Sequence, residues 1–176
     1  MYLKHGNLTI RNAVQDDAEQ LAIWWNDGQI MEHAGFPNGT GQTVQEISDS
    51  LKSDADDTHR RLMIEMDQVA IGEMNYRNKG YGVAEIGIKI CKFSKQNKGN
   101  GKILLSLLID FLYKELGFKK IILDTNLKNE RAQHVYEQLG FTKLRVRTDS
   151  WVNQVGELQS SVDYELYPDS FHNFAK

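Results

Sequence analysis

Apolar residues recur along this chain with two periods, one of two residues and one near 3.6, and segments of the two kinds alternate. The two-residue period predicts strands and the longer one predicts amphipathic helices. The predicted strands cover residues 8–11, 61–66, 69–76, 84–93, 120–124, 141–152 and 156–167. The predicted helices cover residues 15–26, 43–51, 101–116 and 129–139. The segment 27–41, which is rich in glycine, is predicted to be an irregular loop.

Several local signals support these boundaries. Thr43 and Glu46 have the spacing of a capping box, and Asp67-Gln68 is placed to form a hairpin turn. The helix 101–116 has a broad apolar stripe and is followed by Gly117, which favours its termination. Gly87 interrupts a strand and predicts a bulge or a close approach of another chain segment.

The order of elements predicts an α/β fold with a mixed sheet. Residues 84–125 read as strand, helix and strand, which is expected to form a right-handed parallel crossover with helices on both faces of the sheet. A length of 176 residues suits one domain over 1–176. Apolar residues make up 40% and charged residues 26% of the chain, as in ordinary globular proteins.

Composition also bears on location and partners. There is no apolar run long enough for a membrane span, no apolar signal core at the N-terminus, and one cysteine, so we expect a cytoplasmic protein without a membrane partner. No basic stripe with interleaved aromatics appears, which argues against a nucleic-acid partner. Residues 1–57 hold ten acidic and three basic residues, which indicates either solvated helix faces or a surface that attracts a cation.

The segment from Gln96 to Lys102 carries the most specific chemical signal. It follows a predicted strand and opens the strongest helix, and Gly99 and Gly101 allow its backbone to turn several amides toward one point. The first turn of a helix leaves amides unpaired, and the helix dipole favours an anion there. Lys98 and Lys102 add positive charge. A pyrophosphate fits such a site, although a plain glycine-rich turn has the same composition.

Two common phosphate motifs do not fit this segment. A P-loop needs glycine where Gln96 stands and Ser or Thr where Ile103 stands. A dinucleotide-binding fingerprint needs glycine where Leu104 stands. A nucleotide-binding domain is therefore disfavoured.

The pattern Gln96-x-x-Gly99-x-Gly101, between a strand and an apolar helix, resembles motif A of the GNAT acetyltransferases. The segment Asn129-Glu130-Arg131-Ala132, continued by Tyr136 and by Leu139-Gly140-Phe141, resembles motif B of the same family. The resemblance spans roughly residues 8–167 and is strongest over 84–141. It implies the GNAT fold, with a mostly antiparallel central sheet and one parallel crossover pair.

The resemblance implies acetyl-coenzyme A as co-substrate. In the family the loop amides hold the pyrophosphate, and pantetheine lies where two parallel strands splay apart. The residues expected to bind coenzyme A are Ile88, Ile90, Cys91, Gln96, Asn97, Lys98, Gly99, Asn100, Gly101, Lys102 and Asn129.

The resemblance also places Tyr136 where many members hold a general acid near the departing sulfur. As the base, Glu85 and Glu73 on central strands are candidates, and so is direct attack with water carrying the proton. Cys91 as an acyl-accepting nucleophile is disfavoured, because no histidine lies near it in the sequence. The five histidines show no metal-ligand spacing, so no metal is expected.

The expected reaction is acetyl transfer to a primary amine by direct attack in a ternary complex. The acceptor is a polyamine, an aminoglycoside-like small molecule or a peptide N-terminus, and residues 24–28 are similar to the branch of ribosomal-protein and aminoglycoside acetyltransferases. The candidate acceptor-binding residues are Trp24, Asp27, Glu32, Phe36 and Trp151. Two alternatives stay open, a sensor that binds acyl-coenzyme A without turnover and, for assembly, a homodimer, since many relatives pair.

Overall fold

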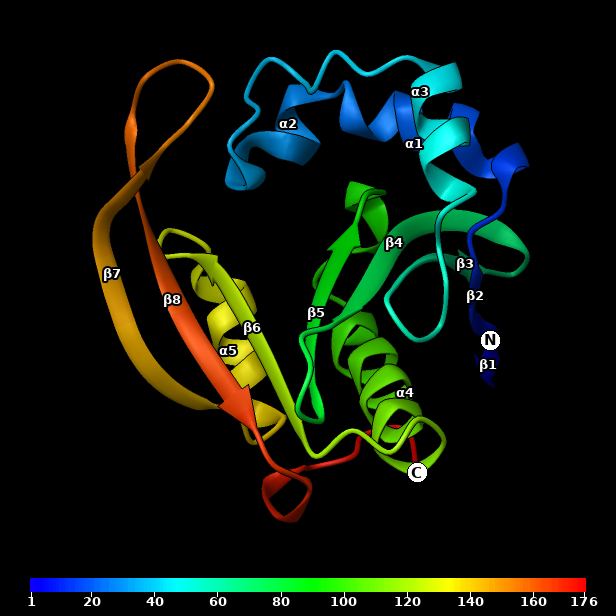
Figure 1. Ribbon diagram of the computed structural model, residues 1–176, viewed down its shortest axis with the longest axis vertical. Helices are drawn as coiled ribbons and strands as arrows, with labels where there is room; N and C mark the ends of the chain where they lie inside the picture. The colour runs from blue at the N-terminus through cyan, green and yellow to red at the C-terminus, as the bar shows by residue number, and fades with distance from the viewer.

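The computed structural model describes residues 1–176 and contains one eight-stranded sheet in the order β1-β2-β3-β4-β5-β6-β8-β7 (Figure 1). The strands are β1 (Tyr2–His5), β2 (Leu8–Asn12), β3 (His59–Met66), β4 (Val69–Asn78), β5 (Val83–Ile90), β6 (Lys120–Asn126), β7 (Thr142–Val152) and β8 (Leu158–Leu166). Neighbouring strands are antiparallel except β5 and β6. The expected mixed sheet with one parallel crossover pair is confirmed.

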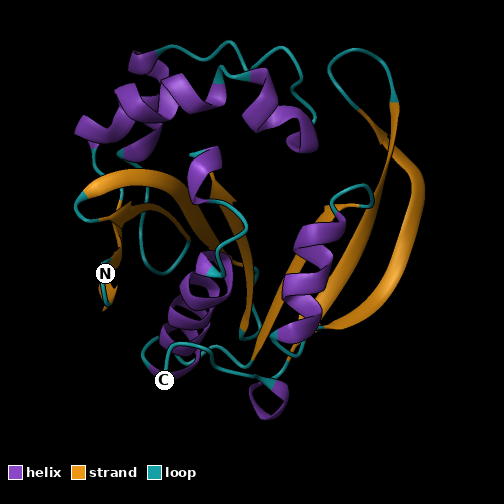
Figure 2. Cartoon of the chain, turned by 180° about the vertical axis from the view of Figure 1, so that it is seen from behind, coloured by secondary structure: helices purple, strands orange, loops and turns teal.

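Helices cover both faces of this sheet, as predicted. The α-helices are α1 (Ala18–Trp25), α2 (Gly28–Met31), α3 (Val44–Leu51), α4 (Asn100–Lys114) and α5 (Glu130–Gln138). The 3-10 turns are η1 (Gln15–Asp17), η2 (Glu32–Ala34), η3 (Phe93–Lys95) and η4 (Pro168–Ser170). The helices α4 and α5 lie on one face and α1 to α3 arch over the other, as the two opposite views show (Figures 1 and 2). No helix is both long and apolar enough to cross a bilayer.

Two hydrophobic clusters hold these layers together. The larger joins the sheet to α4 and α5 and includes Leu104, Leu108 and Leu112 from the predicted apolar stripe. The smaller lies under α1 and α3 and includes Trp24 and Cys91. The sheet from β2 to β5 is therefore packed on both faces. This packing holds β5, the strand that contributes most to the site, in place.

The capping and turn signals of the sequence form as predicted. Thr43 Oγ1 accepts from the amide of Glu46 over 3.1 Å, and the Glu46 carboxylate accepts from the amide of Thr43 over 2.8 Å. Asp67 and Gln68 both have positive φ, as a two-residue hairpin turn requires. These short-range signals depend only on neighbours along the chain.

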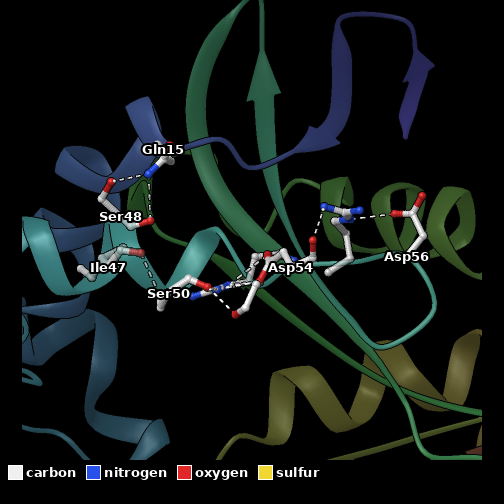
Figure 3. A network of polar contacts seen from close by, with 9 residues as sticks. Gln15, Ile47, Ser48, Ser50, Asp54 and Asp56 are labelled. Atoms are coloured by element: carbon white, nitrogen blue, oxygen red, sulfur yellow. Dashed lines mark hydrogen bonds and ion pairs between the residues drawn. The ribbon is translucent and has the colours of Figure 1, made fainter.

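An ion-pair network joins α3 to β3 (Figure 3). The Arg61 guanidinium donates to both carboxylate oxygens of Asp54 and to the hydroxyl and carbonyl oxygens of Ser50. Only 14% of the Arg61 side chain and 2% of the Asp54 side chain are exposed. Because both charges are removed from water, each depends on the other for its compensation.

Two features differ from the predictions. The strand β1 was not predicted, because its four residues are partly exposed and it forms by pairing with β2 across a turn at Gly6. The predicted loop 27–41 contains α2, whose first turn is capped by Asp27 accepting from the amide of Gln29.

Gly87 does not form the predicted bulge, since the register of β4 with β5 is unbroken. It instead permits a close approach, because a Cβ at this position would lie 2.9 Å from the side-chain nitrogen of Asn75. The irregularity lies in β3, between Ile64 and Glu65. A mid-strand glycine signals crowding or a bulge, and the sequence alone does not distinguish them.

Candidate active site

The two parallel strands separate after a short paired stretch, and a cleft opens between them. Their pairing joins Val83–Glu85 to Lys120–Ile122, after which β5 runs on to Ile90 and β6 to Asn126 without a partner on that side. The cleft has a volume of about 1010 Å³. Residues of β5, β6, α5, β7 and η2 line it. The divergence of the strands is visible in Figure 1.

One end of the cleft, which we call the loop end, consists of Gln96 to Lys102. Asn97 and Gly99 have φ values of 58° and 77°, and left-handed residues in such a loop turn successive amides toward the same side. None of the amides from Asn97 to Lys102 has an acceptor in the protein. Since they include the first turn of α4, the helix dipole adds positive potential. This arrangement suits a phosphate or pyrophosphate group.

Side-chain hydrogen bonds hold the loop in this form. Gln96 donates from Nε2 to the carbonyl oxygen of Ile90 over 2.7 Å, which ties the loop to the end of β5. Asn100 donates from Nδ2 to the carbonyl oxygen of Lys95 over 3.0 Å. These two polar side chains therefore order the backbone that surrounds the site.

Most of the residues expected to bind coenzyme A are brought together along the cleft. Those that line it are Ile88, Ile90, Gln96, Asn97, Gly99, Gly101, Lys102 and Asn129. Lys98, Asn100 and Cys91 do not. Asn129 also caps α5 by accepting from the amide of Ala132, and Arg131 donates to Asn97 over 3.2 Å, so the second motif contacts the first.

Cys91 is buried in the smaller hydrophobic cluster. Burial raises the pKa of its thiol well above the ordinary value, and the nearby charge of Glu73 adds to this effect. The thiol is therefore neutral at physiological pH and lacks the thiolate that a nucleophile needs.

Tyr136 projects from α5 into the middle of the cleft. Its ring packs against Phe141 and Tyr164, with ring centroids 5.8 and 5.7 Å away. Its hydroxyl group has no hydrogen-bond partner in the protein and remains accessible to solvent, so it faces the open cleft. Burial raises the pKa of the phenol, and the charge of Asp124 adds to the rise. Tyr136 therefore keeps its proton and is available to donate it.

The opposite end, which we call the charged end, is formed by side chains from β6, β7, β8 and η2. Asp124 on β6 lies 3.3 Å from Arg147 on β7, and both line the cleft. Partial burial raises the pKa of the Asp124 carboxyl, against the opposing effect of Arg147. Ser161 on β8 and Glu32 on η2 also line this end.

Trp151 forms a wall of the charged end. Its Nε1 donates to Ser161 Oγ over 2.9 Å, and its ring lies against Gly35, where a Cβ would come within 2.5 Å. Trp151 and Glu32 are thus the two predicted acceptor residues that line the cleft.

The other three predicted acceptor residues lie elsewhere. Trp24 is buried in the smaller cluster, Asp27 caps α2 and Phe36 is partly exposed outside the cleft. Trp24 is buried within this cluster, whereas Trp25 is partly buried, packs against its edge and donates to Glu73. The two neighbouring tryptophans therefore have different surroundings, which the sequence did not resolve.

The two predicted bases also lie outside the cleft lining. Glu73 accepts from Trp25 Nε1 over 2.8 Å and lies 3.7 Å from Lys89 Nζ, and 13% of its side chain is exposed. Glu85 lies in the paired part of β5 and is 3.9 Å from Lys79. Glu85 is thus paired outside the cleft, whereas Glu73 is paired with Lys89, a residue that lines it.

Sequence reasoning missed Asp124 and Arg147. A usable signal existed for Asp124, since it ends an apolar run in a strand of the parallel pair, and ligands of α/β sheets bind beyond the carboxyl ends of such strands. Arg147 had no such signal, because its place depends on the register of β7 with β8.

Comparison with known proteins agrees with this geometry. A sequence model of the acetyltransferase (GNAT) domain matches residues 7–142, which is most of the chain. The chain belongs to the GNAT acetyltransferase family. The expected family is confirmed, and the chain is an acyl-coenzyme-A-dependent N-acetyltransferase with acetyl-coenzyme A as its co-substrate.

Solved structures share the fold. The spermidine N-acetyltransferase of Vibrio cholerae, in complex with coenzyme A and spermine, is 24% identical with a TM-score of 0.82, covering 93% of this chain and 97% of that one. A ribosomal L7/L12 alpha-N-protein acetyltransferase in complex with coenzyme A is 13% identical with a TM-score of 0.85, covering 97% and 99%. At these identities the GNAT fold is what the likeness establishes.

No group of three or more His, Cys, Asp or Glu side chains is arranged to hold a metal ion. The groups in the cleft that the proposals below use are main-chain amides, the Tyr136 phenol and the side chains of the charged end.

Proposed function

We propose that this GNAT protein transfers the acetyl group of acetyl-coenzyme A to a primary amine by direct attack in a ternary complex. The observation that carries the proposal is that one continuous cleft holds an amide-lined anion site at its loop end and a charged wall at the other. Tyr136 lines the same cleft. An anionic coenzyme and an amine can therefore approach one reacting centre from opposite ends.

The residues have distinct proposed roles. The amides from Asn97 to Lys102, assisted by Lys102, hold the pyrophosphate of the coenzyme. The unpaired edge of β5, around Ile88 and Ile90, hydrogen-bonds the pantetheine arm and polarises the thioester carbonyl through its amides. The Tyr136 phenol donates its proton to the departing sulfur. When bound, the coenzyme supplies an activated acyl group.

A polyamine is the acceptor class that we favour. Glu32 and Asp124 give the charged end two exposed carboxylates, and Trp151 offers an aromatic face, both of which suit an alkylammonium group. A solved relative of the same fold is a spermidine acetyltransferase bound to spermine. Aminoglycoside-like amines and peptide N-termini share the ammonium group and are the other members of the test set.

The test is an assay of coenzyme A release from acetyl-coenzyme A with polyamines, aminoglycosides and short peptides. We expect release that depends on the amine and falls about 10²–10³-fold in kcat in the Tyr136→Phe variant, because the proton donor is lost. Tyr167→Phe is the matched control, since Tyr167 is exposed and outside the cleft. If both variants lose activity equally, Tyr136 is not the acid.

The same assay separates the enzyme from the alternative of an acyl-coenzyme A sensor. Tight binding of coenzyme A by calorimetry, without transfer to any amine of the set, favours the sensor. We further propose that residues 1–176 act as a single domain in the cytoplasm, and that the enzyme uses no metal.

A further inference from the structure

Asp124 lines the cleft just beyond the point where β5 and β6 separate. The last paired residues of the two strands are Glu85 and Ile122, and Asp124 follows two residues later on β6. Its side chain is 54% exposed and lines the same cleft as Tyr136. Carboxylate and phenol therefore face one space from β6 and from α5.

Asp124 is only weakly engaged by the protein. Arg147 donates to it once, over 3.3 Å, but makes three contacts of 2.9 to 3.2 Å with Asp163. Arg147 therefore pairs mainly with Asp163. An amine can take its place beside Asp124 without leaving the guanidinium unpaired.

The surroundings of Asp124 favour a carboxylate that accepts a proton readily. Partial burial has the largest effect on its pKa and raises it, Arg147 opposes this rise, and the negative charges of Glu85 and Asp163 add to it. A base whose pKa is closer to neutrality takes up a proton more effectively during a reaction at neutral pH. The charged and titratable groups around it are Glu85 on β5, Arg147 on β7, Asp163 on β8, Tyr136 on α5, and Glu32 and His33 on η2.

We propose that Asp124 is the general base that receives the proton of the acceptor amine. This inference rests on the amine acetylation proposed above and replaces Glu85 and Glu73 in that role, since both lie outside the cleft lining. The neutral amine nitrogen forms its bond to the thioester carbonyl carbon while the C–S bond breaks.

The protons of this step balance between two residues. The N–H proton moves to a carboxylate oxygen of Asp124, and the sulfur takes the phenol proton of Tyr136. Transfer of the proton from Asp124 to the Tyr136 phenolate then restores both side chains. No further reactant is needed.

The experiment compares the kcat–pH profiles of wild type and Asp124→Asn on two acceptors whose amine pKa values differ. We expect Asp124→Asn to lower kcat about 10²–10⁴-fold. The acid limb that is common to both acceptors in the wild type should vanish in the variant. Coenzyme A affinity by calorimetry and thermal unfolding should stay at wild-type values, since Asn keeps the shape of the side chain.

Asp149→Asn is the matched control, because Asp149 is exposed on β7 outside the cleft and its φ of 48° is one that Asn also adopts. A rise in KM for the amine with unchanged kcat and an unchanged acid limb overturns the proposal, and so does loss of that limb in Glu85→Gln instead. Wild-type protein that acetylates no amine defeats the proposed function itself, which is a separate outcome.

Discussion

The molecule has two halves that meet at the splayed strands, and they are packed differently. The first half, β1 to β5 with α1 to α4, has hydrophobic clusters on both faces of its sheet. The second half, β6 to β8 with α5, is covered on one face only, and most of β7 is exposed. The long β7–β8 hairpin meets the first half near its tip, where Gln154 hydrogen-bonds with Gly35, Asn38 and Gly39 and the Trp151 ring lies against Gly35.

This difference separates two tasks. The first half carries the loop end, whose amides must already be oriented toward the anion site in the free protein. Close packing on both faces of the sheet makes this half rigid enough to hold that orientation. The second half carries Asp124, Arg147 and Trp151, which are side chains on a sheet face open to the cleft. We expect substitutions in the first half to affect stability and coenzyme binding, and those in the second half to affect the amine.

The largest expected effect on stability comes from Arg61→Met in the first half. The substitution leaves Asp54, which is almost fully buried, without its partner. Breaking a buried ion pair costs about 3–5 kcal/mol in the free energy of unfolding. Chemical denaturation measures this, and a change below about 1 kcal/mol would contradict the rigid role given to the α3–β3 junction.

The next largest effect concerns coenzyme binding. Gly101→Glu places a carboxylate in the first turn of α4, among the unpaired amides, and we expect it to weaken coenzyme A binding at least ~100-fold through repulsion of the phosphates. Gly101→Ala is the matched control, because a Cβ at this position meets only the Ile90 side chain at 4.0 Å. Calorimetry should find Gly101→Ala close to wild type. Equal losses in the two variants would show that size, rather than charge, matters there.

The two halves also differ in how far the sequence predicted them. The loop end lies in one continuous segment, so glycine spacing and a helix start were enough to locate it. The charged end gathers Asp124, Arg147 and Trp151 from two strands whose register is set by long-range pairing. Glu73 was predicted as a base but instead accepts a hydrogen bond from Trp25, which lies 48 positions away in the sequence. No local sequence pattern indicates that contact.

The strand and helix boundaries show the same contrast between local signals, which the sequence reveals, and long-range pairing, which it does not. The capping box of α3 and the hairpin at Asp67-Gln68 depend on neighbouring residues and were predicted. The strand β1 depends on pairing with β2 and was not predicted, and at Gly87 only the structure distinguishes a close approach to Asn75 from a bulge. Elements defined by tertiary pairing therefore need the fold before they can be assigned.

A smaller effect is expected from Trp151→Ala in the second half. Removing the indole opens the charged end and takes away the aromatic face, so KM for the amine should rise about tenfold, in line with about 1–2 kcal/mol for a lost cation–π contact. Coenzyme A affinity should not change. Val152→Ala, on the adjacent exposed residue, is the control. A loss of coenzyme affinity in Trp151→Ala would break the separation of the two ends.

The smallest effect is expected from Arg145→Met in the second half. This substitution is the counterpart of Arg61→Met in the first half, so the two compare the halves directly. Arg145→Met removes a guanidinium that lies 2.7 Å from Asp163 but is 69% exposed. Exposed ion pairs contribute little, and Asp163 keeps Arg147 as its partner, so the free energy of unfolding should change by less than about 0.5 kcal/mol. Denaturation of Arg61→Met and Arg145→Met under the same conditions measures the contrast. If Arg145→Met destabilises the protein as much as Arg61→Met does, the ion pairs of β7 and β8 are structural, and the second half is as rigidly built as the first.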